Sequence, residues 1–216
     1  PTLRRYHKLL WSKPLPDGSR FNLSDQETGK YLYHHSVKGE FWLSSDTIGH
    51  SYSRVKIKKL LPIISQVAPS DLDSFRNLVQ TIGGKLIFPS NCIDRKPTIN
   101  GGRGIHHQIK DRFDLTLECI RRYYQKENSP LVETLERYAD FFRLFVDFRG
   151  YVEFFLLQDL VSSDYTTINF WMPFEGFEHS PLPADKERYL EYRKHCMAFL
   201  EARNQRIQAY CLDHNI

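Results

Sequence analysis

The chain has 216 residues, of which 41% are hydrophobic, 14% aromatic and 26% charged, and its formal net charge is +4. This composition excludes an intrinsically disordered chain, because disordered segments contain few aromatic residues. The positive charge is weaker than expected for a dedicated nucleic-acid-binding domain, although it permits attraction to phosphate-bearing ligands. We expect a single domain, residues 1–216, since this length can bury a substantial core.

The sequence predicts β-strands mainly in the first half of the chain. Residues 5–11 read as a strand, and residues 30–36 and 40–45 read as the two strands of a β-hairpin. Residues 85–89 (KLIFP) read as a buried strand, and residues 167–174 as a last strand. Because most of these strands precede most of the helices, the order favours an α+β fold. We therefore expect N-terminal antiparallel strands packed against a mainly helical C-terminal part.

Helices are predicted where apolar residues recur every three or four positions. Ser129 and Pro130 suit a helix start, because Ser can cap the first turn and Pro fits the first helical position. The predicted helices span residues 55–64, 70–82, 103–124, 130–145, 151–161 and 181 to about 212.

The helix predicted at residues 103–124 is the most informative segment, because it has two stripes with the same spacing. The apolar stripe predicts a face packed on the core, and the polar stripe predicts either a solvated surface or a prepared polar site. The apolar stripe contains Ile105, Ile109, Phe113, Leu117, Ile120 and Tyr124. The polar stripe contains His107, Asp111, Asp114, Glu118 and Arg121.

The segment Asn100-Gly101-Gly102-Arg103-Gly104 is expected to form a loop before this helix. Free N–H groups at a helix start, flexible glycines and an arginine together favour an anion-binding pocket. The segment lacks the Gly-Lys-Ser/Thr ending of a Walker loop and the spacing of a dinucleotide fingerprint. The alternative is a loop whose glycines only supply positive φ angles.

We assign candidate roles to the charged residues of this region. Asp111, Asp114 and Glu118 would act as acid or base or bind a cation, because crowding raises the pKa of a carboxyl group. The alternative is a surface ladder of ion pairs, which would contribute roughly 0–1 kcal/mol per pair. The candidate ligand-binding residues, at which a phosphate or carboxylate would be held, are Arg103, His107, Arg112, Arg121 and Arg122.

Two further features have structural as well as functional interpretations. Asp159 interrupts an apolar run and needs a buried partner, for which Arg112, Arg121 and Arg203 are the candidates. We expect this pair to clamp helices together. The hairpin sequence around residues 34–35 (His-His) loosely resembles the first strands of ADP-ribosyltransferases, in which a histidine holds nicotinamide dinucleotide; a plain hairpin is the alternative.

The chain as a whole resembles a bacterial family known only as a domain of unknown function. The resemblance implies one domain of bacterial, intracellular origin, and it implies no activity, cofactor or catalytic residue. The segments that carry it are HKLLWSKPLPDG, YLYHHS, FWLSSD, TIGGKLIFP, DRFDLTLECIRRYY, YADFFRLF and FFLLQDLV.

The cysteine spacing and the hydropathy of the chain predict its setting. None of the four cysteines (residues 92, 119, 196 and 211) forms a C-x-x-C pair, so the spacing predicts no metal site. No apolar run reaches the ~18 residues that a membrane span requires, and no signal peptide is recognisable. We therefore expect a cytoplasmic protein without a membrane partner.

Three functions follow as hypotheses. The first is binding or processing of a phosphate-containing ligand, a nucleotide or nucleic acid, at an Arg/Asp/Glu pocket, with the cofactor left open. The second is a non-enzymatic interaction module whose buried charges fix the helix arrangement. The third is an ADP-ribosyltransferase-like enzyme that uses His34 or His35.

Overall fold

The computed structural model describes residues 2–25, 31–53 and 57–216 and has an α+β fold. The four strands of these ranges form one antiparallel sheet in the order β1-β2-β3-β4. The helices follow mainly in the C-terminal part, so the predicted fold class is confirmed. The strands are β1 (Ser24–Asp25), β2 (Leu32–Ser36), β3 (Gly39–Thr47) and β4 (Lys85–Pro89).

Nine α-helices and three short 3-10 helices lie in the described ranges. The α-helices are α1 (Thr2–Trp11), α2 (Leu61–Ile64), α3 (Pro69–Val79), α4 (Ile99–Ile105), α5 (Phe113–Gln125), α6 (Val132–Glu136), α7 (Ala139–Arg143), α8 (Phe148–Phe154) and α9 (Lys186–His214). The 3-10 helices are η1 (Lys58–Leu60), η2 (Ile82–Gly84) and η3 (Gln158–Leu160).

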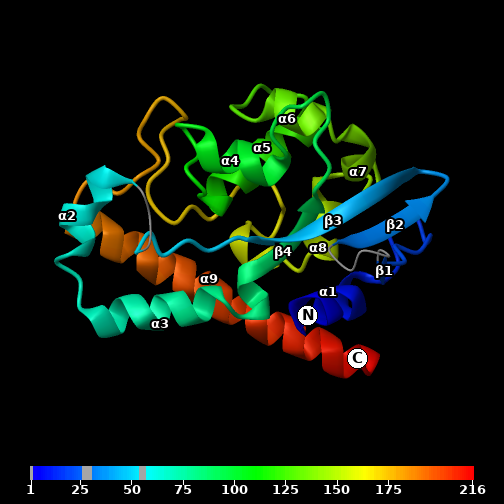
Figure 1. Ribbon diagram of the computed structural model, residues 1–216, viewed down its shortest axis with the longest axis horizontal. Coiled ribbons are helices and arrows are strands. Elements are labelled where there is room, and N and C mark those ends of the chain that lie inside the picture. The colour runs from blue at the N-terminus through cyan, green and yellow to red at the C-terminus, as the bar shows by residue number, and fades with distance from the viewer. Residues whose placement is uncertain (1, 26–30, 54–56) are drawn as a thin grey trace.

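Helices lie on both sides of the sheet. In Figure 1, α1, α3 and the long helix α9 lie below the strands, whereas α4, α5, α6 and α7 lie above them. The contacts agree, because α3 and η2 pack on α9, whereas α4 packs on β4 and α7 on β3. The segment that follows α1 packs on the C-terminal part of α9, since the ammonium group of Lys13 lies 4.6 Å from the ring centroid of Tyr210.

The predicted hairpin and the buried strand are confirmed. β2 and β3 pair from Leu32 with Leu43 to Ser36 with Gly39, and all five residues of β4 are buried. The predicted helix at residues 70–82 corresponds to α3 and η2, and the last predicted helix corresponds to α9. Residue 30 of the predicted strand 30–36 and residues 55–56 of the predicted helix 55–64 lie outside the described residues.

Residues 5–11 form part of helix α1, so the predicted strand was wrong. The buried residues His7, Leu10 and Trp11 are spaced three and four apart, while Tyr6 and Leu9 are exposed. This is the pattern of a helix with one face on the core. A hydrogen bond from Trp11 Nε1 to His7 Nδ1 (3.0 Å) joins successive turns of that face.

The single helix predicted over residues 103–124 was also wrong, because it is divided between α4 and α5. The glycines lie inside α4, which starts at the Thr98 cap, rather than in a loop before a helix. Lys110 and Asp111 have positive φ angles of 46° and 61°, which interrupt the helical path. The polar stripe therefore does not follow one straight helix.

Three other predicted elements differ from the structure. Residues 130–145 form two short helices, α6 and α7. The helix predicted at 151–161 ends at Phe154, because Leu156 has a positive φ angle of 55°. Residues 167–174 form no strand and contribute only one isolated bridge, between Ile168 and Val161.

Candidate functional site

Arg103 holds the end of β3 to the turn before α5. Its guanidinium donates hydrogen bonds to the carbonyl oxygens of Thr47 (2.9 Å) and Asp111 (2.9 Å) and to Thr116 Oγ1 (3.2 Å). The side chain is buried, and Asp111 Oδ1 lies 3.7 Å from its Nη1. Because its donors bond to other parts of the chain, Arg103 has a structural role that joins β3 to the turn before α5. The glycines beside it are part of helix α4.

Arg112 and Asp114 form a sealed ion pair. Arg112 Nε donates to Asp114 Oδ1 (3.0 Å), its Nη2 donates to Oδ2, and its Nη1 donates to the carbonyl oxygen of Pro181 (3.2 Å). The backbone N–H of Trp171 also donates to Asp114 Oδ2 (2.9 Å). The exposed fractions of the two side chains are 3% and 0%, so neither side chain is accessible to a ligand.

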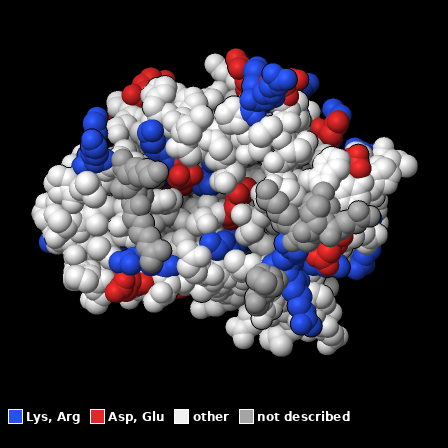
Figure 2. Space-filling view, viewed as in Figure 1, with Lys and Arg blue, Asp and Glu red and all other residues white. Residues whose placement is uncertain are grey.

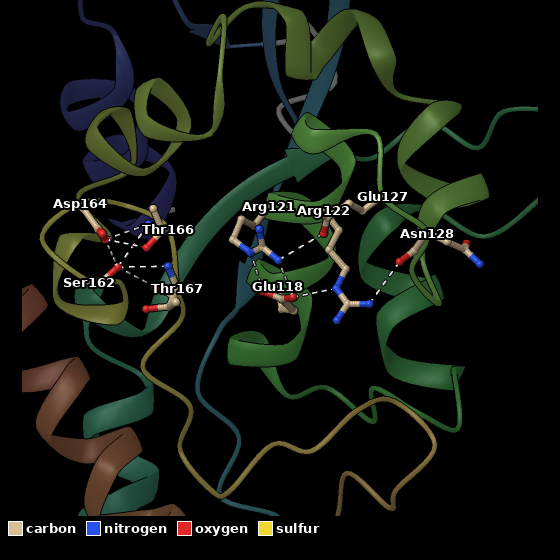
Figure 3. Close-up of polar contacts among 9 residues, drawn as sticks. All are labelled: Glu118, Arg121, Arg122, Glu127, Asn128, Ser162, Asp164, Thr166 and Thr167. Carbon is tan, nitrogen blue, oxygen red and sulfur yellow. Dashed lines mark hydrogen bonds and ion pairs between the residues drawn. The ribbon is translucent and has the colours of Figure 1, made fainter.

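Glu118 lies between two arginines, as Figure 3 shows. Arg121 Nε and Arg122 Nε donate to its two oxygens at 2.8 and 2.7 Å. Arg121 Nη2 also donates to Glu127 Oε2 (3.3 Å), and Arg122 Nη1 donates to the carbonyl oxygen of Asn128 (3.3 Å). Glu118 is therefore held in place by these two arginines, both of which were predicted to bind a ligand.

A hollow of about 410 Å³, here called the α5 hollow, lies beside Arg121. Its wall includes Arg149 but also the carboxylates of Glu127, Asp147 and Asp164. In Figure 3, Asp164 is bonded within its own turn, to Ser162 and Thr166, and not to the Glu118 cluster. An excess of acidic over basic side chains opposes the binding of phosphate.

The remaining predicted residues are dispersed. His107 is exposed and stacks on His106, with ring centroids 5.0 Å apart. His34 is buried against Phe21, and its Nδ1 bonds to the carbonyl oxygen of Asn22 (2.8 Å). Histidines 34 and 35 are absent from the residues that line the α5 hollow.

A second hollow, here called the β3–α3 cleft, was not predicted. Its volume is about 430 Å³, within the range of small-molecule sites. In Figure 2, the surface is hollowed at the centre of this face, where Figure 1 places the end of β3 above α3. Figure 2 also shows Asp and Glu atoms in this central hollow, but no Asp or Glu is among the residues that line the cleft. The lining residues are Thr47, Gly49, His50, Ser51, Arg76, Asn77, Val79 and Gln80.

The cleft is rich in hydrogen-bond donors. Arg76 Nε is buried and has no hydrogen-bond partner among the described residues, although its Nη2 pairs with Asp73 (2.9 Å). His50 Nδ1 accepts the N–H of Tyr52 (3.0 Å), and burial lowers the pKa of His50, so the neutral ring carries its proton on Nε2. Lys85 Nζ lies behind the wall and donates to Thr47 Oγ1 (2.9 Å) and Gln80 Oε1 (3.0 Å).

The backbone that supplies His50 is held in an unusual conformation. Tyr52 has a φ angle of 56°, which is rare for an aromatic residue, and its hydroxyl donates to the carbonyl oxygen of Lys110 (2.7 Å). The hydroxyls of Tyr192 and Tyr189 donate to the carbonyl oxygens of His50 and Ser51, both at 2.6 Å. Such over-determined strained segments are found at functional sites.

A model of a family of unknown function, DUF6994, matches residues 1–207. The chain belongs to this family. The match confirms the resemblance to a domain of unknown function, and it brings no activity or catalytic residue to this DUF6994 protein. No curated protein and no solved structure matches the chain. No helix in the described ranges is both long and apolar enough to cross a membrane.

Asp46 gives the β3 end of this DUF6994 protein a titratable carboxyl group near neutral pH. It precedes the cleft residue Thr47, so its side chain lies on the opposite face of the strand. Burial raises the pKa of Asp46 to about 7, while Arg103 and Lys85 oppose the rise and Asp111 adds to it. Its Oδ2 is buried without a hydrogen-bond partner among the described residues.

The free energy of unfolding should therefore depend on the protonation of Asp46. Because its pKa rises from 3.8 to about 7 on folding, the folded protein holds an extra proton between these pH values. Raising the pH through this window should cost stability, and Asp46→Asn should be more stable than wild type at pH 8 by about 2–4 kcal/mol. Urea unfolding of both proteins at several pH values measures the difference.

His7 does not confuse this comparison. Burial and the charges of Arg203 and Lys85 lower the pKa of His7 to about 4. Because of this shift, the free energy of unfolding rises as the pH rises from about 4 to 6.5. That rise is present in wild type and in the variant and cancels in their difference. A difference that does not change between pH 4 and pH 8 would contradict the prediction.

Proposed function

We propose that this protein binds a small phosphate-bearing ligand, such as a nucleotide, in the β3–α3 cleft. The observation that carries the proposal is the buried Nε–H donor of Arg76, which lines the cleft and has no partner among the described residues. Buried donors are almost always satisfied, so an unpaired guanidinium N–H at a cleft favours a ligand that can accept it. An anionic oxygen is the strongest such acceptor.

The other cleft side chains support an anionic ligand. His50 Nε2, the amide of Asn77 and the hydroxyl of Ser51 can donate hydrogen bonds, and none of the cleft's lining residues is acidic. Lys85 adds a positive charge directly behind Thr47 and Gln80. A volume of about 430 Å³ suits a nucleotide, whereas a nucleic-acid strand needs an extended basic groove.

The proposal is for binding rather than hydrolysis. Among the described residues no carboxylate lines the cleft, and Asp114 is sealed against Arg112. Of the carboxyl groups predicted to be catalytic, Asp111 acts on His50 through its charge, which opposes the lowering of the pKa of His50 by burial. Asp111 and Arg103 would thus position the His50 segment rather than contact the ligand.

Arg76→Gln should weaken nucleotide binding about tenfold or more, because a charge-assisted hydrogen bond is worth about 1.5–3 kcal/mol. Isothermal titration of the full chain with ADP, ATP and pyrophosphate measures the affinity. Arg143→Gln is the matched control, since Arg143 is an exposed arginine that pairs with Asp140 outside the cleft. Equal affinities of the two variants, or no binding by wild type, would refute the proposal.

A non-enzymatic interaction module is the second candidate. The sealed Arg112–Asp114 pair favours it, because this hypothesis requires buried charges to serve architecture. This candidate would be favoured if the wild-type chain bound no nucleotide in the titration and formed a stable complex with another protein. A bacterial, cytoplasmic origin also belongs to the proposal, and the four free cysteines, two of them buried, are compatible with a reducing compartment.

A further inference from the structure

Lys13 places its ammonium group among three aromatic rings at the junction of α1, α8 and α9. Its Nζ lies 5.2 Å from the ring centroid of Trp11, 4.7 Å from that of Phe154 and 4.6 Å from that of Tyr210. The residue is 8% exposed. No acidic side chain of the described residues forms an ion pair with it. The three rings attract the charged form of Lys13 through cation–π interactions, but they do not replace the water that burial removes.

The charges around Lys13 favour its neutral form. Burial lowers the pKa of Lys13 to about 7, and the positive charge of the buried Arg203 contributes. Arg203 lies on the same indole, with its guanidinium carbon 5.8 Å from the ring centroid of Trp11. A desolvated lysine beside another cation is the arrangement that makes an amine nucleophilic near neutral pH.

Lys13 also lines a hollow of about 250 Å³. Glu153 lines the same hollow, where it accepts hydrogen bonds from Arg149 Nε (2.8 Å) and the hydroxyl of Tyr165 (2.9 Å). The bond from Arg149 is the main reason that the pKa of Glu153 is lowered, so this carboxylate stays ionised. The other lining residues are Pro14, Leu15, Pro16, Gly150, Phe154 and Tyr210.

We infer that Lys13 is a covalent binding site for a small aldehyde or ketone, which enters this hollow and forms a Schiff base with the Lys13 amine. The nitrogen lone pair attacks the carbonyl carbon and forms a C–N bond. The carbonyl oxygen then takes up the two hydrogens of the amine and leaves as water, so that the product is an imine. Glu153 is the candidate proton relay, because it is the carboxylate of the hollow. The inference is independent of the β3–α3 cleft, which shares no lining residue with this hollow.

Reductive trapping of the wild-type chain tests the inference directly. The protein is incubated at pH 7 with propanal and cyanoborohydride, and peptide mass spectrometry measures the alkylation rate of each lysine. We expect Lys13 to react about tenfold faster than the exposed Lys126 and Lys186, because more of its amine is neutral. A rate for Lys13 no higher than that of these two lysines would overturn the inference.

A variant separates reactivity from the structural role of the ammonium. Lys13→Arg retains a cation over the three rings but cannot form an imine. We expect this variant to lose the fast-reacting site and to keep the slow alkylation of Lys126 and Lys186. If the fast phase of alkylation persists in Lys13→Arg, it belongs to another amine and the inference is overturned.

Discussion

Asp114→Asn should lower the free energy of unfolding by about 3–5 kcal/mol, because it leaves the guanidinium of Arg112 buried without a counter-charge. Asp114 accepts two hydrogen bonds from Arg112 and one from the backbone N–H of Trp171. Both side chains are almost completely excluded from water, so solvent cannot replace the lost carboxylate. Urea unfolding at pH 7 measures the loss.

Glu118→Gln is the matched control on the same helix. Glu118 pairs with Arg121 and Arg122, whose side chains are 18% and 29% exposed, so water can solvate these arginines after the substitution. We expect a loss of about 1 kcal/mol, in the range of partly exposed ion pairs. If the two variants lose equal stability, the sealed character of the Arg112–Asp114 pair does not govern the energetics.

The pair can also be tested by a double-mutant cycle. Arg112→Met removes the buried cation, and adding Asp114→Asn to it should cost much less than Asp114→Asn costs in wild type. The difference is the interaction energy of the two side chains. Additive losses would show that Asp114 acts mainly through the N–H of Trp171 rather than through Arg112.

Arg203→Met should be similarly destabilising, with a loss of about 4 kcal/mol or more, because it leaves several buried carbonyl groups unpaired at about 1–3 kcal/mol each. Arg203 is completely buried in α9 and has no carboxylate partner among the described residues. Instead, it donates hydrogen bonds to backbone carbonyl oxygens. These belong to Gly83 (2.7 Å), Lys85 (2.8 Å), Phe155 (3.0 Å) and Leu156 (3.2 Å).

Arg203 thereby joins α9 to the segment before β4 and to the end of α8. Arg206→Met is the control, since Arg206 lies on the next turn and is 38% exposed in its pair with Asp159. That pair should contribute about 0–1 kcal/mol. In thermal and urea unfolding, Arg203→Met should be far less stable than Arg206→Met. The reverse order would contradict the structural role of Arg203.

The pairing of Asp159 shows how far sequence reasoning reached. The apolar run around Asp159 correctly indicated that this carboxylate needs a partner, and an arginine of α9 supplies it. The partner is Arg206, however, rather than Arg112, Arg121 or the predicted Arg203. A polar residue in an apolar stripe signals that a partner exists, but its identity depends on how two distant segments pack.

The polar stripe of residues 107–121 illustrates the same limit. Its spacing singled out Asp114 and Glu118, both of which are buried, yet the turn at Lys110 and Asp111 places the members of the stripe in different environments. His107 is exposed, Asp114 is sealed, and Glu118 is held by two arginines. The assumption that residues 103–124 form one helix with one polar face was wrong.

The β3–α3 cleft had no recognisable signal in the sequence. Its two walls come from residues 47–51 and 76–80, and Arg76, Asn77 and Gln80 read as the ordinary solvent face of a short helix. Nothing in the local pattern distinguishes a polar face that meets water from one that meets a strand end. Only the packing of α3 near the end of β3 makes this face part of a cleft.

The sequence by itself determined the α+β class, the β2–β3 hairpin, the buried strand β4 and the long helix α9, because these depend on periodicity and turn residues within short windows. The tertiary structure decided that residues 5–11 are helical, which charges are sealed, and where a polar cleft opens. These depend on contacts between residues up to about 140 positions apart, such as that between Tyr192 and His50. Burial and the choice of partner, which set the cost of each charge, are properties of the packed chain.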